Sequence, residues 1–396
     1  MENLKLSILK SLYFTSPQSI AELSNAIGKS VPNITSTVNK LLESNLIEQN
    51  GHAPSTGGRR AAQFVPKTDN LPLILCVAID QLYTSVVIVD FQNNFKSDIL
   101  TKKIDQKDAA SFDKLTDLIQ ELFSQQTFKN IYAIGITIPG FVDSNTGKND
   151  SYPADSKFYD LKSNIEHVFN VPTFVENDSS AIAIAEHQFG QGEKSKNAMV
   201  VNLNWGVGLG MILDNELYRG HSGYAGEFSH IPLSNVSKLC SCGKKGCLEV
   251  EASLLAAVDF AHEKLQLGED SSLRDQFQKN RLITGDQLLE AANVGDQLAL
   301  EAIHRIGYML GKGIATLIHI INPEKVIISG RGAKAKNVLL PQVQSAIYEF
   351  SIQRLSQHTI IQFSSTENIQ LLGSACITIA NADKNIYKRL KTEIIN

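Results

Sequence analysis

Long hydrophobic runs are missing from this chain of 396 residues, and no stretch has the features of a secretory leader. Because no run of eighteen apolar residues occurs, we expect no helix that crosses a membrane. The first residues, MENLKLSILKSLYFTS, interrupt their apolar positions with charge and contain no cleavage site, which favours a short amphipathic helix over a signal peptide. The expected compartment is therefore the cytoplasm, with no membrane insertion.

A large excess of either charge is also missing. The net charge is −4, and the hydrophobic and charged contents of 43% and 20% are those of an ordinary soluble protein. The length is too great for one core, so we expect two or three domains. Residues 1–68 carry a net charge of +3, which leaves −7 for the remainder. A small basic head on an acidic body is typical of a DNA-binding module joined to a ligand-binding body.

Cysteine is scarce, yet three of the five cysteines fall within eight residues. A histidine stands ten residues before the first of them, and Gly243 and Gly246 separate the last two. One imidazole and three thiolates form the ligand set of a closed structural zinc site, and the glycines allow a tight fold around the ion. In a reducing cytosol such a cluster favours a metal over a disulfide. The alternative is a set of small, unpaired core residues. The predicted zinc ligands are His230, Cys240, Cys242 and Cys247.

The same segment resembles the signature of the ROK family, which groups bacterial sugar kinases with sugar-responsive transcriptional repressors. Residues 220–230 fit the pattern G-x-x-G-x-A-G-E-x-x-H, and residues 240–249 fit C-x-C-G-x-x-G-C-L-E. Ser229 departs from the pattern, because the family usually has glycine there. The resemblance leaves open which branch of the family the chain follows.

Residues 1–66 are predicted to form a winged helix-turn-helix domain. A first helix spans residues 3–15, a second runs from the capping box of Ser19 and Glu22 to Gly28, and a third covers residues 31–45. The second and third of these helices form the helix-turn-helix motif. The second helix of such a motif, here residues 31–45, enters the major groove of DNA. Short strands at residues 46–48 and 63–65 would form the wing.

The loop of the wing reads STGGRR, residues 55–60, and resembles that of the repressor branch. Its glycines let the backbone approach DNA, and its arginines can bind phosphate or enter the minor groove. A winged helix used for protein contact is the alternative. The predicted DNA contacts are Asn33, Thr35, Ser36, Asn39, Lys40, Gly57, Gly58, Arg59 and Arg60.

Beyond a linker at residues 67–72, apolar β-branched runs alternate with helical patterns, which indicates an α/β body with largely parallel sheets. The family resemblance implies the two-lobed, actin-like fold of the sugar kinases. We expect residues 73–177 to form the first lobe, completed by a C-terminal helix at 374–396. Residues 178–373 would form the second lobe with the zinc site.

Polar residues at the end of one predicted strand, Asn177 and Asp178, are well placed for ligand contact. The resemblance implies that Asp178 matches the base of the sugar kinases and that the asparagine binds a sugar hydroxyl. It also implies that His230 binds zinc through one nitrogen and faces the sugar with the other. A helix N-cap is the alternative role for Asp178. The sugar contacts implied by the family are Gly140, Asn177, Asp178, Glu227, His230 and Glu249.

The turns that hold ATP phosphates in the kinases are altered here. After Asp80, the residues Gln81, Leu82 and Tyr83 stand where the family's kinases have a glycine-rich turn, and bulky side chains prevent close approach of phosphate. Trp205 replaces a phosphate-binding hydroxyl, and we interpret Gly208 as a strand–helix packing residue. Arg331 intrudes at the expected adenosine site, between Gly330 and Gly332.

The combined features predict a sugar-responsive transcriptional regulator, a repressor without catalytic activity, that binds operator DNA as a homodimer or homotetramer. Its effector would be a sugar or sugar phosphate in the cleft between the lobes. One alternative is an active ROK-type sugar kinase that carries a DNA-binding head. Another is a scaffold whose body binds a protein, such as a component of a transport system.

Overall fold

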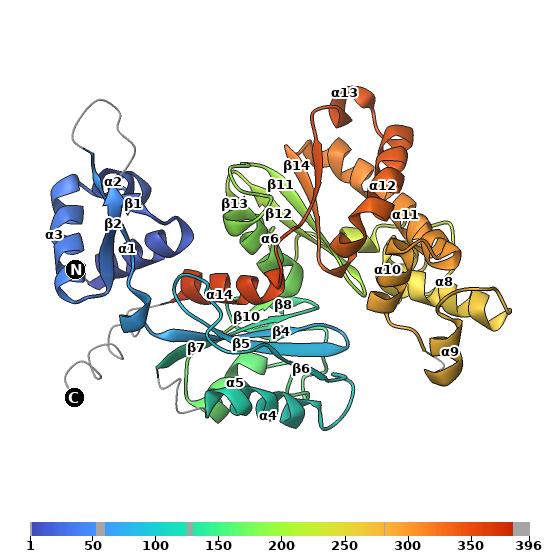
Figure 1. Cartoon of the computed structure of the whole chain (residues 1–396), viewed down its shortest axis with the longest axis horizontal. Helices are drawn as coiled ribbons and strands as arrows, with labels where there is room; N and C mark the ends of the chain where they lie inside the picture. The colour runs from blue at the N-terminus through green and yellow to red at the C-terminus, as the bar shows by residue number, and fades with distance from the viewer. Residues whose placement is uncertain (1, 53–59, 125–129, 281, 383–396) are drawn as a thin grey trace. The chain divides into compact units, whose positions relative to one another are not determined.

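The computed structural model describes residues 2–52, 60–124, 130–280 and 282–382 (Figure 1). The chain divides into two compact units. The first unit comprises Met1–Asp178 and Gln370–Asn396, and the second comprises Ser179–Ile369. The chain therefore passes between the units twice, at 178/179 and at 369/370.

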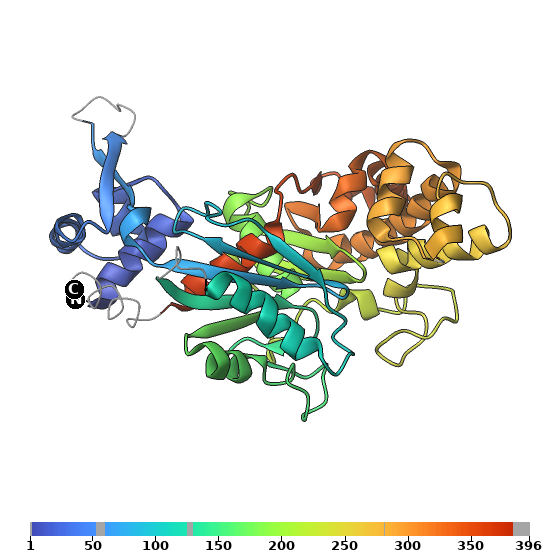
Figure 2. The same cartoon turned by 60° about the horizontal axis from the view of Figure 1, so that its bottom comes forward.

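The head of the first unit contains three helices and a small antiparallel sheet of order β1-β3-β2. Its elements are α1 (Glu2–Phe14), β1 (Gln18–Ser19), α2 (Ile20–Ile27), α3 (Val31–Glu43), β2 (Ile47–His52) and β3 (Ala62–Pro66). The capping box of Ser19 and Glu22 is present, and Gly28 ends α2 with a left-handed φ of 66°. Figure 2 shows the β2–β3 hairpin projecting from the helices, as the predicted wing should.

The body of the first unit is a five-stranded sheet of order β10-β7-β4-β5-β6. Helices α4 and α5 cover one face of this sheet and α14 covers the other (Figure 1). The predicted linker contains a short 3-10 helix, Thr68–Asn70, and the side chain of Leu71 beside it is buried. The remaining elements are β4 (Leu73–Ile79), β5 (Tyr83–Val89), β6 (Leu100–Lys103), α4 (Ser111–Phe123), β7 (Ile131–Ile138), β8 (Val142–Asp143), β9 (Lys148–Asn149), α5 (Leu161–Phe169), β10 (Thr173–Asn177) and α14 (Ile369–Asn381).

The second unit contains a five-stranded sheet of order β13-β12-β11-β14-β15 and a set of helices. Helix α6 (Asp178–Phe189) begins at the boundary between the units. The strands are β11 (Ala198–Leu203), β12 (Val207–Leu213), β13 (Glu216–Leu217), β14 (Lys325–Ser329) and β15 (Ile360–Phe363). The helices are η2 (Phe228–His230), α7 (Glu249–Ala252), α8 (Leu254–Gln266), α9 (Arg274–Asn280), α10 (Gly285–Asn293), α11 (Gln297–Ile321), η3 (Arg331–Ala335), α12 (Lys336–Phe350) and α13 (Gln353–Ser356).

The two large sheets share one plan, in which three parallel strands are continued by two antiparallel ones. This repetition is the two-lobed, actin-like arrangement that we expected. The expectation of largely parallel sheets was wrong, because tight hairpins join β4 to β5 and β11 to β12. A connection of three residues can only produce an antiparallel pair.

Glycines allow β12 to lie directly against α6. A Cβ atom on Gly208 would stand 2.0 Å from Oγ of Ser179, and one on Gly210 would stand 2.3 Å from Cβ of Ala183. Both glycines therefore serve strand–helix packing, as we predicted for Gly208. Among the described helices, none combines the length and apolar character that a membrane span requires.

Candidate functional site

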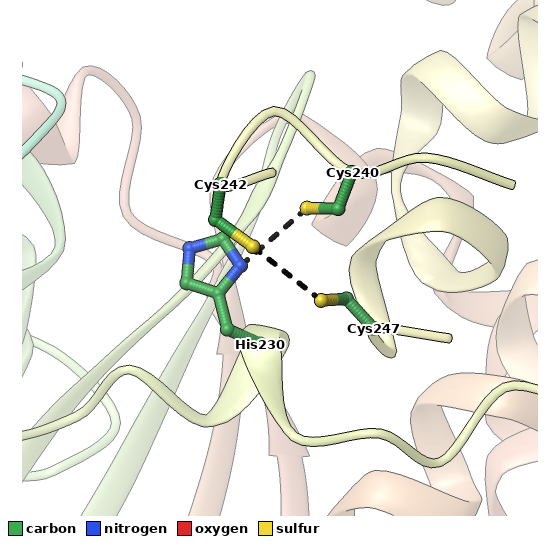
Figure 3. A group of neighbouring side chains, drawn as sticks. All are labelled: His230, Cys240, Cys242 and Cys247. Atoms are coloured by element: carbon green, nitrogen blue, oxygen red, sulfur yellow. Dashed lines mark hydrogen bonds between the residues drawn. The ribbon is translucent and has the colours of Figure 1, made fainter. Parts of the chain in front are cut away.

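Four side chains of the second unit converge on one point (Figure 3). The ligand atoms of His230, Cys240, Cys242 and Cys247 all lie within 4.8 Å of one another. The Sγ atoms of Cys242 and Cys247 are 3.6 Å apart, and Nδ1 of His230 is 3.6 Å from Sγ of Cys240. Thiolates bound to Zn²⁺ at about 2.3 Å in a tetrahedron are separated by about 3.8 Å. The group therefore has the donors and the spacing to hold a metal ion.

A tight turn brings the cysteines together. The backbone N–H of Gly243 donates to the carbonyl oxygen of Cys240 at 2.9 Å. The N–H of Cys240 donates to the carbonyl oxygen of Lys244 at 2.8 Å. Gly243 and Gly246 have φ values of 82° and 80°, in the left-handed region that glycine adopts without strain. The glycines predicted to permit the close fold occupy the conformations that require them.

The cluster is electrostatically suited to a cation. Burial, with a smaller contribution from the neighbouring thiols, raises the pKa of the Cys247 thiol to about 12. The pKa of Cys242 lies below its usual value because the backbone N–H of Lys244 donates to its sulfur. Metals bind the thiolate form, so a cation at this point would stabilise an ionised Cys247 that burial alone disfavours.

The second nitrogen of the histidine is directed to a carboxylate. Nε2 of His230 lies 3.5 Å from Oε2 of Glu227, an arrangement that fixes the ring of a metal-binding histidine. Burial raises the pKa of Glu227, an effect that the nearby His230 opposes and the charge of Glu249 supports. Glu227, His230 and Glu249, all predicted sugar contacts, therefore lie near one another in the second unit.

The other predicted sugar contacts belong to the first unit. Parallel pairing of β7 and β10 brings Gly140 close to Asn177, whose Nδ2 donates to the carbonyl oxygen of Gly140 at 3.0 Å. Asp178 is buried and is the first residue of α6. It thus combines a helix-start position with the strand end at which ligand contacts gather.

Two residues that we did not predict hold the turn around Gly140. Nδ2 of the buried Asn149 donates to the carbonyl oxygen of Pro139 at 2.9 Å, and Oγ of Ser151 accepts the N–H of Phe141 at 2.9 Å. Gly140 has a φ of 110°, and a Cβ atom there would stand 2.5 Å from Oγ of Ser151. No motif or spacing in the sequence indicates these contacts.

The turn between β4 and β5 is closed by its own aspartate. One carboxylate oxygen of Asp80, Oδ1, accepts the N–H groups of Leu82 and Tyr83 at 2.7 and 2.6 Å. The N–H of Asp80 itself donates to the carbonyl oxygen of Tyr83 at 2.9 Å. Nε2 of Gln106 donates to the carbonyl oxygen of Asp80 at 2.7 Å. These three backbone N–H groups are therefore occupied within the turn.

The turn between β11 and β12, residues 204–206, has the equivalent place in the second unit. The ring of Trp205 is buried against α10, with carbon atoms 3.4 and 3.5 Å from the position of a Cβ atom on Gly285. The guanidinium group of Arg331 forms an ion pair with Asp286 of the same helix. An indole ring and an ion pair therefore occupy the surroundings of this turn.

Helix α3 presents one apolar and one polar face. Ile34, Val38 and Leu41 are buried in the head. Among the predicted DNA contacts of this helix, Asn33, Ser36 and Asn39 are exposed, while Thr35 and Lys40 are partly buried. Arg60 of the wing is exposed, and Gly57, Gly58 and Arg59 lie outside the described residues. The outward face of α3 thus carries the polar groups that base recognition requires.

Comparison with known proteins identifies relatives over nearly the whole chain. A sequence profile of the ROK family matches residues 77–381. The chain is 28% identical to a xylose repressor of Bacillus spizizenii over 376 residues, which cover 94% of each protein. It is 29% identical over 358 residues to the DNA-binding transcriptional dual regulator NagC of Escherichia coli, covering 90% of this chain and 86% of that protein.

Solved structures show the same relationship. A ROK family transcriptional regulator, described as a homologue of the E. coli protein MLC, matches with a TM-score of 0.76 and 26% identity over 98% of this chain and 99% of its own. A ROK family glucokinase from Streptomyces griseus, solved with glucose and AMPPNP, matches with a TM-score of 0.68 and 24% identity over 76% of this chain and 98% of its own. The glucokinase likeness shows the fold of the body. Because the family profile covers most of the sequence, the chain belongs to the ROK family.

Proposed function

We propose that the protein is a sugar-responsive transcriptional repressor that binds operator DNA through its winged-helix head. One observation carries the proposal: the regulator structure matches 98% of the chain, whereas the glucokinase matches 76% and nearly all of its own length. A kinase of this family can lack the head. Its α3 helix exposes polar side chains on the face opposite its buried residues.

The effector is a small carbohydrate or its phosphate. Carboxylate, amide and imidazole groups are the donors and acceptors that fix the hydroxyls of a sugar ring. The groups that would supply them are the side chains of Asn177, Asp178, Glu227, His230 and Glu249 and the backbone of Gly140. The relatives are named for different sugars, xylose and N-acetylglucosamine, so the proposal names the class of ligand and no single sugar.

The protein senses its sugar without phosphorylating it. A phosphate group would need free backbone N–H groups in the β4–β5 turn. Those of Leu82 and Tyr83 are hydrogen-bonded to Oδ1 of Asp80, the carboxylate of the same turn. In the second turn, Trp205 provides no hydroxyl, and Arg331 is engaged by Asp286. These contacts support a regulator over an active kinase.

The metal is a structural Zn²⁺ held by His230, Cys240, Cys242 and Cys247. When bound, it supplies no open coordination position, since all four ligands come from the protein. Its effect is to fix the loop from residue 230 to 247 and, through the His230 ring, the position of Glu227. The protein acts in the cytoplasm as a homodimer or homotetramer, because paired heads that read a palindromic site add affinity and register.

The test measures fluorescence anisotropy of labelled DNA from upstream of the protein's own gene, titrated with protein across a range of salt concentrations. Xylose, glucose, N-acetylglucosamine and their phosphates are added in turn. We expect tight, salt-sensitive binding that one sugar weakens by about 5–150-fold, the usual range of allosteric coupling. The variant Asp178→Asn serves as the matched control and should bind the DNA without responding to the sugar.

Other outcomes would redirect the assignment. Absence of DNA binding at any salt concentration contradicts a repressor, and sugar-dependent turnover of ATP to ADP with formation of the sugar phosphate would identify a kinase instead. If the fully metal-loaded protein binds DNA but no sugar, a protein partner such as a transport component becomes the better effector. A normal sugar response of Asp178→Asn would place the effector away from the strand end.

A further inference from the structure

A tyrosine of the first helix of the head is buried against the body of the first unit. Tyr13, on α1, is only 4% exposed, and its hydroxyl donates to Oδ1 of Asn93 at 2.6 Å. Its ring also meets the ring of Phe91 edge-to-face, with 6.2 Å between the centroids. Burial raises the pKa of Tyr13 well above its usual value, so the hydroxyl keeps its proton and stays a donor.

The acceptor belongs to a rigid turn that follows β5. Oδ1 of Asp90, which is buried, accepts the N–H groups of Gln92 and Asn94 at 2.8 and 3.0 Å. Asn93 is held at a φ of 61°, and Nε2 of Gln92 donates to the carbonyl oxygen of Pro66, the last residue of the wing. The turn therefore holds both α1 and the end of the wing.

Helix α14 contacts the same tyrosine from the body. The thiol of the buried Cys376 lies within hydrogen-bonding reach of the Tyr13 hydroxyl. One helical turn further on, the carbonyl oxygen of Ala380 accepts a hydrogen bond from Nζ of Lys10 at 2.6 Å. A cation at the C-terminal end of a helix is also favoured by the helix dipole. Two residues of α1, Lys10 and Tyr13, thus contact α14 through polar groups.

The other end of α14 contacts β4 and β7, and β7 leads to the turn around Gly140. Nε2 of Gln370 donates to the carbonyl oxygen of Ile79 at 3.0 Å and to Oγ1 of Thr137 at 3.1 Å. Between the two ends, Oγ of Ser374 donates to the carbonyl oxygen of Gly135 at 2.7 Å. A Cβ atom on Gly135 would stand 2.2 Å from Oγ1 of Thr378, so helix and strand can hardly slide past each other.

We infer that Tyr13 is a positioning residue, which fixes the DNA-binding head to α14 and to the turn at Asn93 and so carries the sugar response to the DNA. The inference rests on the proposed function. Helix α14 is where the chain returns from the second unit, at 369/370. A sugar bound at the turn around Gly140, which follows β7, would act on this helix through its contacts with β7, and the head would follow because α1 is bonded to α14.

The experiment compares Tyr13→Phe, Asn93→Gly and the combined variant with the wild type. Phenylalanine keeps the ring and removes the donor, while glycine removes the acceptor and adopts the positive φ without strain. The readout is the ratio of operator affinities without and with whichever of xylose, glucose or N-acetylglucosamine acts on the wild type. Sugar affinity, metal content and thermal unfolding are measured on the same samples.

We expect each single variant to lower this ratio about fivefold, the contribution of one buried hydrogen bond, with sugar affinity and metal content unchanged. The combined variant should lower the ratio no more than either single variant does, because both changes break the same hydrogen bond. Tyr308→Phe removes a tyrosine hydroxyl bond at an exposed position of the second unit, to Glu349 at 2.8 Å, and should leave the ratio of operator affinities intact.

The outcomes separate the two levels of the proposal. A wild type that responds to sugar, with Tyr13→Phe and Asn93→Gly responding equally, overturns this inference and leaves the repressor function standing. A wild type whose DNA binding ignores every sugar removes both. If Tyr308→Phe lowers the ratio of operator affinities as much as Tyr13→Phe does, the effect is one of general destabilisation. That result would also overturn the positioning role.

Discussion

At the scale of single residues, the metal cluster offers the most direct test. Cys240→Ser replaces a thiolate by a hydroxyl that binds Zn²⁺ poorly, in a cluster where burial raises the pKa of the Cys247 thiol and a cation would favour its thiolate form. We expect the variant to purify with less than about one tenth of an equivalent of zinc, to unfold at a lower temperature and to lose sugar affinity. Elemental analysis and calorimetry measure these quantities.

Cys76→Ala provides the control for that variant. Cys76 is equally buried but lies on β4 of the first unit, away from the four-residue cluster. It should retain a full equivalent of zinc. A Cys240→Ser protein that keeps both its metal and its sugar affinity would show that the four side chains are not the ligand set.

The cluster could be predicted from sequence because its ligands lie within eighteen residues and its chemistry depends on residue type. The role of Asn149 could not. It is an ordinary polar residue until the fold places its amide against the carbonyl oxygen of Pro139. The same holds for Asp80, whose presence the sequence shows but whose hydrogen bonds to Leu82 and Tyr83 depend on the hairpin.

At the scale of elements, α3 and the wing should contribute differently to DNA binding. Asn39→Ala removes an exposed amide of the kind that pairs with adenine in the major groove. We expect a loss of about 1–3 kcal/mol on the operator and relaxed preference at one base pair per half-site. Anisotropy titrations against an operator library with single base changes measure both effects.

Arg60→Ala should instead weaken binding to all sequences alike, because an arginine on a wing contacts phosphate. We expect the slope of log K against log salt to fall by about one for each phosphate that the variant no longer neutralises. Lys102→Ala is the control, since this lysine is paired with Glu121 on the body at 2.8 Å. An unchanged slope for Arg60→Ala would remove that residue from the DNA contacts.

Most elements were predicted to within a few residues because their signals are local. The capping box of α2 and the apolar stripe of α3 are examples. Strand β1, Gln18–Ser19, has only two residues and exists because it pairs with β3, so no local pattern indicates it. The mixed sheets were missed for a related reason, since apolar runs do not reveal the direction in which neighbouring strands run.

At the scale of the whole molecule, the repeated sheet plan separates two tasks within one chain. The turn between β4 and β5 is closed by its own Asp80, whereas the turn between β11 and β12 packs its Trp205 against α10. The head adds an independent binding surface to this body. A free-energy coupling must connect the head and the body. A ligand of the body shifts DNA affinity only if it binds the DNA-binding state of the protein and the released state with different affinities.

Such coupling is reciprocal, which gives a prediction for the whole assembly. If the inducing sugar weakens operator binding about 5–150-fold, saturating operator must weaken sugar binding by the same factor. Isothermal titration of the sugar into the wild type, alone and with an excess of operator duplex, measures it. A duplex of unrelated sequence is the control and should change sugar affinity far less, because the weakly bound head does not select one state. Sugar affinity that ignores the operator would contradict direct release and would assign the response to a further component that binds the body.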